Sequence, residues 1–116
     1  MAKIFLDDMR ALQASAKAEG WEILKVGEDL PAWIEAHGWP EAIDLDYDLR
    51  EGGRTWDGAS VAVWLRDTFT ASRRPVSEFP LWDVHSSVPR CNAEMEEILA
   101  PYADRRIQGL APIQRG

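Results

Sequence analysis

The 116-residue sequence predicts an α/β domain, an open parallel sheet with helices on both faces. Short apolar runs that favour β-structure alternate with segments in which apolar residues recur at helical spacing. This alternation favours parallel strands joined by right-handed crossovers. The length suits one domain, expected to span residues 1–116, and a hydrophobic content of 46% can supply a single core.

Four segments are expected to be strands because each is short, apolar and bounded by polar or turn-forming residues. They are residues 3–6 (KIFL), 21–26 (WEILKV), 42–49 (AIDLDYDL) and 79–87 (FPLWDVHSS). The second has an imperfect alternation, which is typical of a strand nearer a sheet edge. The third alternates apolar residues with Asp44, Asp46 and Asp48, so a strand that favours burial carries a carboxylate at every other position.

Helices are expected in the segments between these strands. Residues 28–40 contain Pro31, which suits a first turn, and Gly38, which suits a helix end. Residues 59–69 form an apolar face after Asp57, a plausible N-cap. The remaining segments are a helix over 92–106 with Asn92 as its cap, a weak helix or a long loop over 9–20, a glycine-rich loop over 50–58, and a loosely packed tail over 105–116.

The composition restricts the setting of the protein. Thirteen Lys and Arg against 20 Asp and Glu give a net charge of −7, which argues against a broad surface for duplex nucleic acid. The lone cysteine, Cys91, cannot form an internal disulfide, which fits a reducing compartment. There is no signal-peptide pattern and no apolar run of roughly 20 residues, the length of a membrane helix. We therefore expect a soluble, cytoplasmic protein with no membrane partner.

Polar side chains follow three of the predicted strands. Asp7 and Asp8 follow the first strand, Asp46 and Asp48 lie at the end of the third, and His85 follows the apolar part of the fourth. In open α/β sheets the functional crevice lies beyond the carboxyl ends of the strands, and neighbouring strands are about 4.8 Å apart. If these strands are adjacent, the four carboxylates and the imidazole converge on one pocket.

Clustered carboxylates favour a divalent cation at this pocket. Like charges at short range either raise one another's pKa or recruit a cation, and carboxylate oxygens with water suit Mg²⁺ or Mn²⁺. An alternative is that Asp7 and Asp8 are turn residues that cap the following segment. Asp44 lies inside the strand and is expected to face an edge, a neighbouring side chain or the pocket floor rather than to bind a metal.

The segment HSSVPR, residues 85–90, is a candidate phosphate site. Ser86 and Ser87 offer hydroxyl and N–H groups, Arg90 offers a guanidinium, and all three come near a predicted helix N-terminus. The alternative is an ordinary loop with a surface charge. A lone histidine such as His85 is more often structural, but its place at the end of a strand that points towards the acids favours a catalytic role.

Three motifs in order resemble the cyclic-phosphate processing receiver-like family, compact relatives of the response-regulator receiver fold. The first motif ends in Leu-Asp-Asp, the second reads Leu-Asp-His-Asp-Leu and the third is His-Ser. The matching residues are Leu6, Asp7, Asp8, Leu45, Asp46, Asp48, Leu49, His85 and Ser86. Tyr47 stands where the family usually has histidine, and the asparagine that often follows the His-Ser pair is missing.

This resemblance implies a receiver-like, flavodoxin-like parallel sheet of four or five strands in the order 2-1-3-4. It also implies processing of cyclic phosphates, such as 2′,3′-cyclic ends of RNA or cyclic nucleotides. The expected partner is then a phosphorylated small molecule or an RNA end.

The first functional hypothesis is a metal-dependent phosphoesterase that uses Mg²⁺ or Mn²⁺. The metal ligands are then Asp7, Asp8 and Asp46, the catalytic residues are His85, Asp46 and Asp48, and the phosphate-binding residues are Ser86, Ser87 and Arg90. His85 acts as general acid or base in this hypothesis.

Two other functions stay open. A signalling receiver phosphorylated on Asp46 needs a lysine at the end of a fifth strand, but the last lysine of the sequence is Lys25, before the third strand. A binding module captures a phosphorylated ligand or a partner protein without turning it over.

Overall fold

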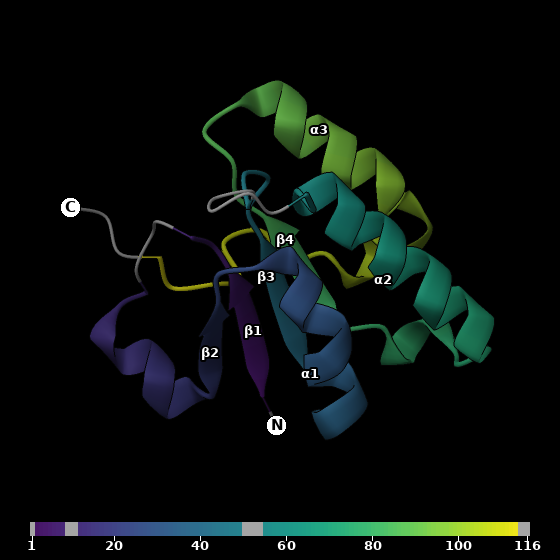
Figure 1. Cartoon of the computed structure of the whole chain (residues 1–116), viewed down its shortest axis with the longest axis horizontal. Helices are drawn as coiled ribbons and strands as arrows, with labels where there is room; N and C mark the ends of the chain where they lie inside the picture. Colours follow the sequence, from purple (N-terminus) through teal and green to yellow (C-terminus); the bar gives the residue numbers. More distant parts are fainter. Residues whose placement is uncertain (1, 9–11, 50–54, 114–116) are drawn as a thin grey trace.

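The sheet has the expected parallel pairing and strand order. A computed structural model describes residues 2–8, 12–49 and 55–113, and structural statements below refer to these. The order β2-β1-β3-β4 confirms the receiver-like prediction (Figure 1). The strands are β1 (Lys3–Leu6), β2 (Trp21–Leu24), β3 (Ala42–Leu45) and β4 (Leu81–Val84).

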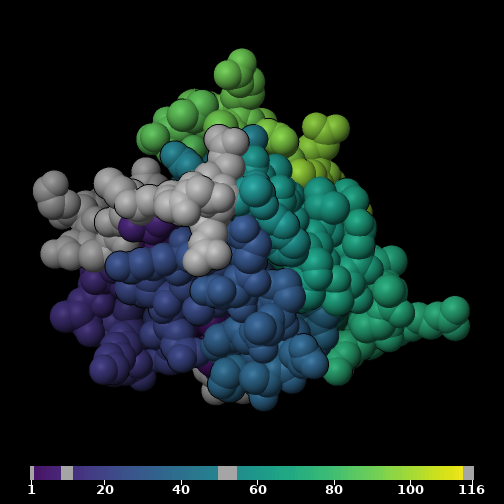
Figure 2. Space-filling model, viewed as in Figure 1, coloured from purple at the N-terminus to yellow at the C-terminus, as the bar shows by residue number. Residues whose placement is uncertain are grey.

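One face of the sheet is covered by the three α-helices. These are α1 (Leu30–His37), α2 (Gly58–Ser72) and α3 (Pro89–Ile98). The strand residues that contact them alternate along each strand, as a pleated strand requires: Ile4, Leu6, Ile43, Leu45, Trp82 and Val84. In the space-filling view, blue atoms of α1 and teal atoms of α2 lie side by side on the face turned towards the viewer (Figure 2). None of the helices in the described part of the chain is long and apolar enough to cross a membrane.

The residues predicted to begin and end α1 and to begin α2 have these roles in the structure. Pro31 lies in the first turn of α1, and Gly38 ends it with a φ of 86°, a backbone conformation that favours glycine. Asp57 is the N-cap of α2, where its Oδ1 accepts a hydrogen bond of 2.9 Å from the N–H of Ser60.

The third strand is shorter than predicted, because the chain leaves the sheet after Asp46. The N–H of Asp46 still donates to the carbonyl of Leu6 at 2.9 Å, so it extends the pairing by one residue. The carbonyl of Tyr47 instead accepts from the N–H of Gly58 at 2.6 Å, which draws the chain towards the start of α2. Asp48 is therefore on a connecting segment and is exposed.

The start of the third helix also differs from the prediction. The helix begins at Pro89 with Val88 as N-cap, and the predicted cap Asn92 lies inside it. Proline suits a first-turn position because an unbonded N–H is normal there. The helix then passes into a 3₁₀ helix, η5 (Ala100–Arg105). Two short 3₁₀ turns, η2 (Gly27–Asp29) and η4 (Val76–Glu78), precede α1 and β4.

The second face of the sheet is covered by a 3₁₀ helix and the C-terminal segment, so helical structure lies on both faces. The segment 9–20, expected to be a weak helix or a loop, contains η1 (Ala14–Glu19), and residues 9–11 lie outside the described residues, as do residues 50–54 of the glycine-rich loop. The cluster on this face consists of Phe5, Ala16, Trp21, Ala42 and Ala111.

Residues 106–113 of the segment expected to be a loosely packed tail contact the sheet. The N–H of Ile107 donates to the carbonyl of Trp82 at 2.9 Å, beside β4. Asp83 accepts from the N–H of Gly109 at 2.8 Å and from Nε of Arg106 at 3.2 Å. This segment, yellow in Figure 1, replaces a full fifth strand with a single bridge between Arg106 and Trp82.

Candidate functional site

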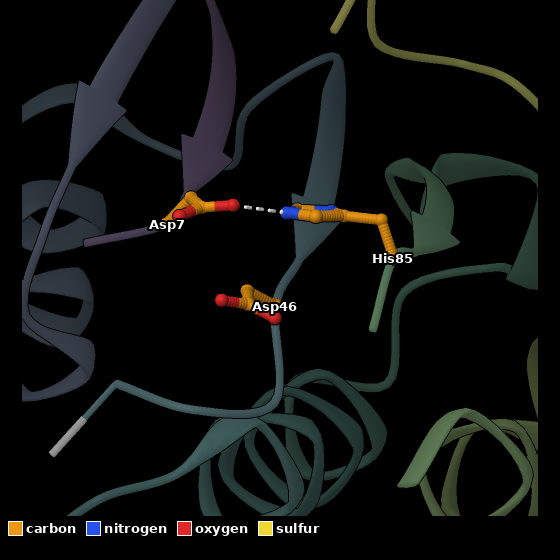
Figure 3. Close-up of side chains that lie close together, drawn as sticks. All are labelled: Asp7, Asp46 and His85. Carbon is orange, nitrogen blue, oxygen red and sulfur yellow. Dashed lines mark hydrogen bonds and ion pairs between the residues drawn. The ribbon is translucent and has the colours of Figure 1, made fainter. Parts of the chain in front are cut away.

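Three polar side chains meet at the carboxyl ends of three adjacent strands. Asp7 follows β1, Asp46 follows β3 and His85 follows β4. Their potential ligand atoms all lie within 4.8 Å of one another, and Figure 3 shows the side chains pointing towards one point. Asp7 and Asp46 are buried, with exposed fractions of 1% and 7%. The sheet thus gathers carboxylates that are far apart in the sequence.

The imidazole of His85 bridges two carboxylates. Its Nε2 lies 2.7 Å from Oδ2 of Asp7, and its Nδ1 hydrogen-bonds to Oδ1 of Asp44. The ring stacks on Phe5 at a centroid distance of 4.8 Å and an interplanar angle of 8°. Because both ring nitrogens and one ring face have protein partners, the orientation of the imidazole is fixed.

This environment changes the protonation of His85. Burial disfavours the charged ring, but hydrogen bonds to Asp44 and Asp7 and the charges of Asp44 and Asp46 outweigh burial and raise the pKa of His85 to about 9. Burial also raises the pKa of Asp44 above its ordinary value, while the hydrogen bond to His85 opposes that effect. The ring is therefore an imidazolium at neutral pH when no metal is bound.

The alternation of carboxylates in residues 42–49 follows from the pleat of the strand. Ile43 and Leu45 point into the helix-covered core, so Asp44 and Asp46 point to the opposite face. Asp44 hydrogen-bonds to His85 and to the backbone N–H of Ala111. It is therefore part of the site, although it is not one of the metal ligands expected from the sequence. The sequence pattern that could identify Asp44 is its spacing of two residues from Asp46, which places both side chains on the same face of the strand.

The donor set fits a hard divalent cation. The carboxylates of Asp7 and Asp46 are ligands that suit Mg²⁺ or Mn²⁺, together with water or phosphate oxygens. Within the described residues, Asp7, Asp46 and His85 are close enough to share an ion. Of the other predicted site residues, Asp8 follows Asp7 and is half-buried, outside this trio, and Asp48 is exposed.

The predicted phosphate-binding loop is organised by Asn92. The N–H of Ser86 donates to Oδ1 of Asn92 at 2.8 Å, and Nδ2 of Asn92 donates to the carbonyl of Ser86 at 2.8 Å. The hydroxyl of Ser86 accepts from the N–H of Val88 at 3.1 Å. The N–H and the hydroxyl of Ser86 therefore form hydrogen bonds within the loop and the helix that follows it. Ser87 and Arg90 have exposed side chains.

Tyr47 connects the loop after β3 to α3 across the rim of the site. Its hydroxyl donates to Oε2 of Glu94 at 3.0 Å. This hydrogen bond, together with burial and nearby negative charges, raises the pKa of Tyr47 to about 12, so the phenol stays protonated and acts as a donor. The backbone N–H of Tyr47 also donates to Oδ1 of Asp46 at 2.8 Å.

Comparisons with known proteins bear on the fold and the family of the chain. A search of the curated proteins gave no match. A solved structure, a fusion of the yeast Spc42 trimeric coiled coil (amino acids 181–211) to another structure, is similar with a TM-score of 0.52 and 17% identity. The match covers 84% of this chain and 62% of that one, and at this identity it supports the fold alone. The model of the cyclic-phosphate processing receiver domain matches residues 2–101, so the chain belongs to that family.

Proposed function

We propose that this protein is a metal-dependent phosphoesterase that acts on cyclic phosphates, either 2′,3′-cyclic phosphate ends or cyclic nucleotides. The observation that carries the proposal is the convergence of Asp7, Asp46 and His85 at the carboxyl edge of the sheet. Family membership supports the cyclic phosphate as the substrate class. The buried carboxylates support the metal.

Asp7 and Asp46 hold the cation in this proposal, and Asp8 stays a predicted third ligand from the same loop. When bound, Mg²⁺ or Mn²⁺ polarises a phosphoryl oxygen and lowers the pKa of a bound water. Asp46 is fixed for this role by the N–H of Tyr47 at 2.8 Å. Asp48, exposed on the following segment, can contact the substrate or its water shell.

His85 supplies the proton transfer. Opening a cyclic phosphate releases an alkoxide oxygen that needs a proton, and a positioned general acid contributes about 10²–10⁴ to the rate. Nε2 of His85 is the proposed proton donor, because it is the ring nitrogen next to the proposed metal ligand Asp7, at 2.7 Å. Its contacts with Asp44 and Phe5 keep the ring from turning away.

The phosphate is expected to bind beside α3. Ser87 and Arg90 have exposed side chains near the start of this ten-residue helix, where backbone N–H groups and the helix dipole favour an anion. Arg90 can form a bidentate pair with two phosphoryl oxygens. Ser86 contributes by holding the loop through Asn92.

The test is turnover of 2′,3′-cyclic AMP and 3′,5′-cyclic AMP by the purified chain with Mg²⁺ or Mn²⁺. Asp46→Asn should abolish both turnover and Mn²⁺ binding measured by calorimetry, because it removes a buried ligand. His85→Asn should lose turnover and keep Mn²⁺ binding. Asp104→Asn, an exposed carboxylate on η5, is the matched control and should change neither.

Two results would point to other functions. Absence of turnover across a broad set of phosphodiesters and metals, together with tight cyclic-nucleotide binding, would identify a binding module. Incorporation of phosphate from acetyl phosphate on Asp46 would identify a signalling receiver. One observation argues against a signalling receiver. Arg106, the basic residue that follows η5 and lies beside β4, pairs with Asp83 at 3.2 Å and with Glu96 at 3.0 Å.

A further inference from the structure

Asp44 is a buried carboxyl that the proposed reaction does not use. It lies in β3 on the sheet face opposite the α-helices and is 1% exposed. Burying a charged group costs free energy unless hydrogen bonds compensate for the lost water. The compensation here comes from Nδ1 of His85 and the backbone N–H of Ala111. The ring of His85 bridges Asp44 and Asp7, so Asp44 acts on the site only through that ring.

We propose that Asp44 is a positioning residue for His85, which fixes the rotation of the ring and turns Nε2 towards Asp7. The contact of Oδ1 of Asp44 with Nδ1 leaves Nε2 as the ring nitrogen that faces Asp7. Phe5 fixes the plane of the ring by stacking, and Asp44 fixes the rotation within that plane. The catalytic consequence rests on the proposed function, whereas the ring geometry does not.

The C-terminal segment supports this arrangement from behind. The N–H of Ala111 reaches Asp44, and Ala111 itself is buried at 7% exposure against the same sheet face. A positioning carboxylate must itself be held, because a group that rotates freely would not fix its partner. Residues 106–111 therefore connect the second face of the sheet to the imidazole at its edge.

Asp83 offers a matched control. It is the register partner of Asp44 on the neighbouring strand and is similarly buried, with 7% exposure. Its hydrogen bonds go to Gly109 and Arg106 of the same C-terminal segment. Replacing either carboxylate with an amide changes hydrogen bonds to the C-terminal segment. Of the two changes, the one at Asp44 also alters a contact of the His85 ring.

The experiment compares wild type, Asp44→Asn and Asp83→Asn, each with ¹⁵N-labelled histidine. The ring signals of the metal-free proteins are recorded by NMR, and the His37→Asn variant assigns them because the chain has two histidines. We expect NOE contacts between the His85 ring and Phe5 in wild type, changed His85 signals in Asp44→Asn and wild-type His85 signals in Asp83→Asn. With Mn²⁺ and 2′,3′-cyclic AMP, Asp44→Asn should lower kcat about 10–100-fold with KM unchanged.

Three results would overturn the role of Asp44. The first is a wild-type spectrum without NOE contacts between the His85 ring and Phe5, which would show that the ring is not held and needs no variant to fold. The second is an Asp44→Asn protein with unchanged His85 signals. The third is an Asp83→Asn protein that reproduces the changes of Asp44→Asn, which would assign them to the C-terminal segment. A wild-type protein without turnover refutes the proposed function instead, and the ring spectra then decide the role of Asp44.

Discussion

The raised pKa of His85 makes the stability of the metal-free protein depend on pH between about 6.5 and 9. Below this window the ring is protonated in both the folded and the unfolded chain, so its interactions with Asp7, Asp44 and Asp46 stabilise the fold fully. As the pH rises through the window, the unfolded chain loses the proton first. The stabilisation therefore decreases and is lost once the pH passes the folded-state pKa.

The size of this change in stability follows from the difference between the unfolded-state and folded-state pKa values of His85. A pKa raised from 6.5 to about 9 corresponds to roughly 3 kcal/mol, at about 1.4 kcal/mol per pH unit. The ring of His85 is 10% exposed, so solvent screens this interaction little. For a domain of this size, whose total stability is on the order of 5–15 kcal/mol, such a loss is easily measured.

The assay is urea unfolding followed by tryptophan fluorescence, in a chelator, at pH 6 and pH 10 and constant ionic strength. Wild type should lose roughly 3 kcal/mol more of its free energy of unfolding than His85→Asn over this interval. The other ionisable groups are common to both proteins, so their contributions cancel in the difference. Equal losses in the two proteins, or a His85 ring that titrates near 6.5 by NMR, would refute this reasoning.

Three substitutions test other parts of the structure. Gly58→Ala should destabilise the protein by about 1–3 kcal/mol and weaken Mn²⁺ binding, because the added Cβ would lie 2.8 Å from Cα of Tyr47, beside a proposed ligand; unchanged calorimetric binding would contradict this. Trp82→Phe should cost at least about 1–3 kcal/mol in urea unfolding, since Nε1 donates to the buried carbonyl of Tyr102 at 2.8 Å. Asp57→Ala should cost about 1 kcal/mol in thermal unfolding through the lost N-cap, and no change would argue against the cap.

The sequence predicts the sheet well because its strands carry local signals. Each strand is a short apolar run, and each connection is long enough for a crossover, so parallel pairing follows. The strand order came from the resemblance, carried by motifs such as Asp7–Asp8 and His85–Ser86. The helix boundaries at Pro31, Gly38 and Asp57 were equally local, since proline, glycine and a capping carboxylate act within one turn.

The differences arise where distant contacts override local preference. Asn92 looks like a cap in the sequence, but its side chain bonds to Ser86 because the loop after β4 folds back over the helix start. Residues 46–49 continue the alternation of the strand, yet Gly58 draws Tyr47 away from the sheet. No local pattern predicts either contact.

The candidate site divides in the same way. That Asp7, Asp46 and His85 come together follows from their place after adjacent strands, which the sequence shows. The role of Asp44 depends on a contact with a residue 41 positions away and on the C-terminal segment that covers it. The sequence after η5 shows no clear periodicity of apolar residues. Hydrogen bonds to buried carboxylates such as Asp83 hold this segment in place instead.

The central position of β1 has a consequence for the order in which the chain folds. Lys3 pairs with both Trp21 and Ala42, so β1, which precedes both of its partners in the chain, must wait for two later strands. His85 follows β4, the last of the four paired strands in chain order, and a nascent chain that stops before it would hold Asp7 and Asp44 without their imidazole. Pairing of β4 with β3 therefore also brings the imidazole to the carboxylates, and a half-made chain lacks the group on which the proposed reaction depends.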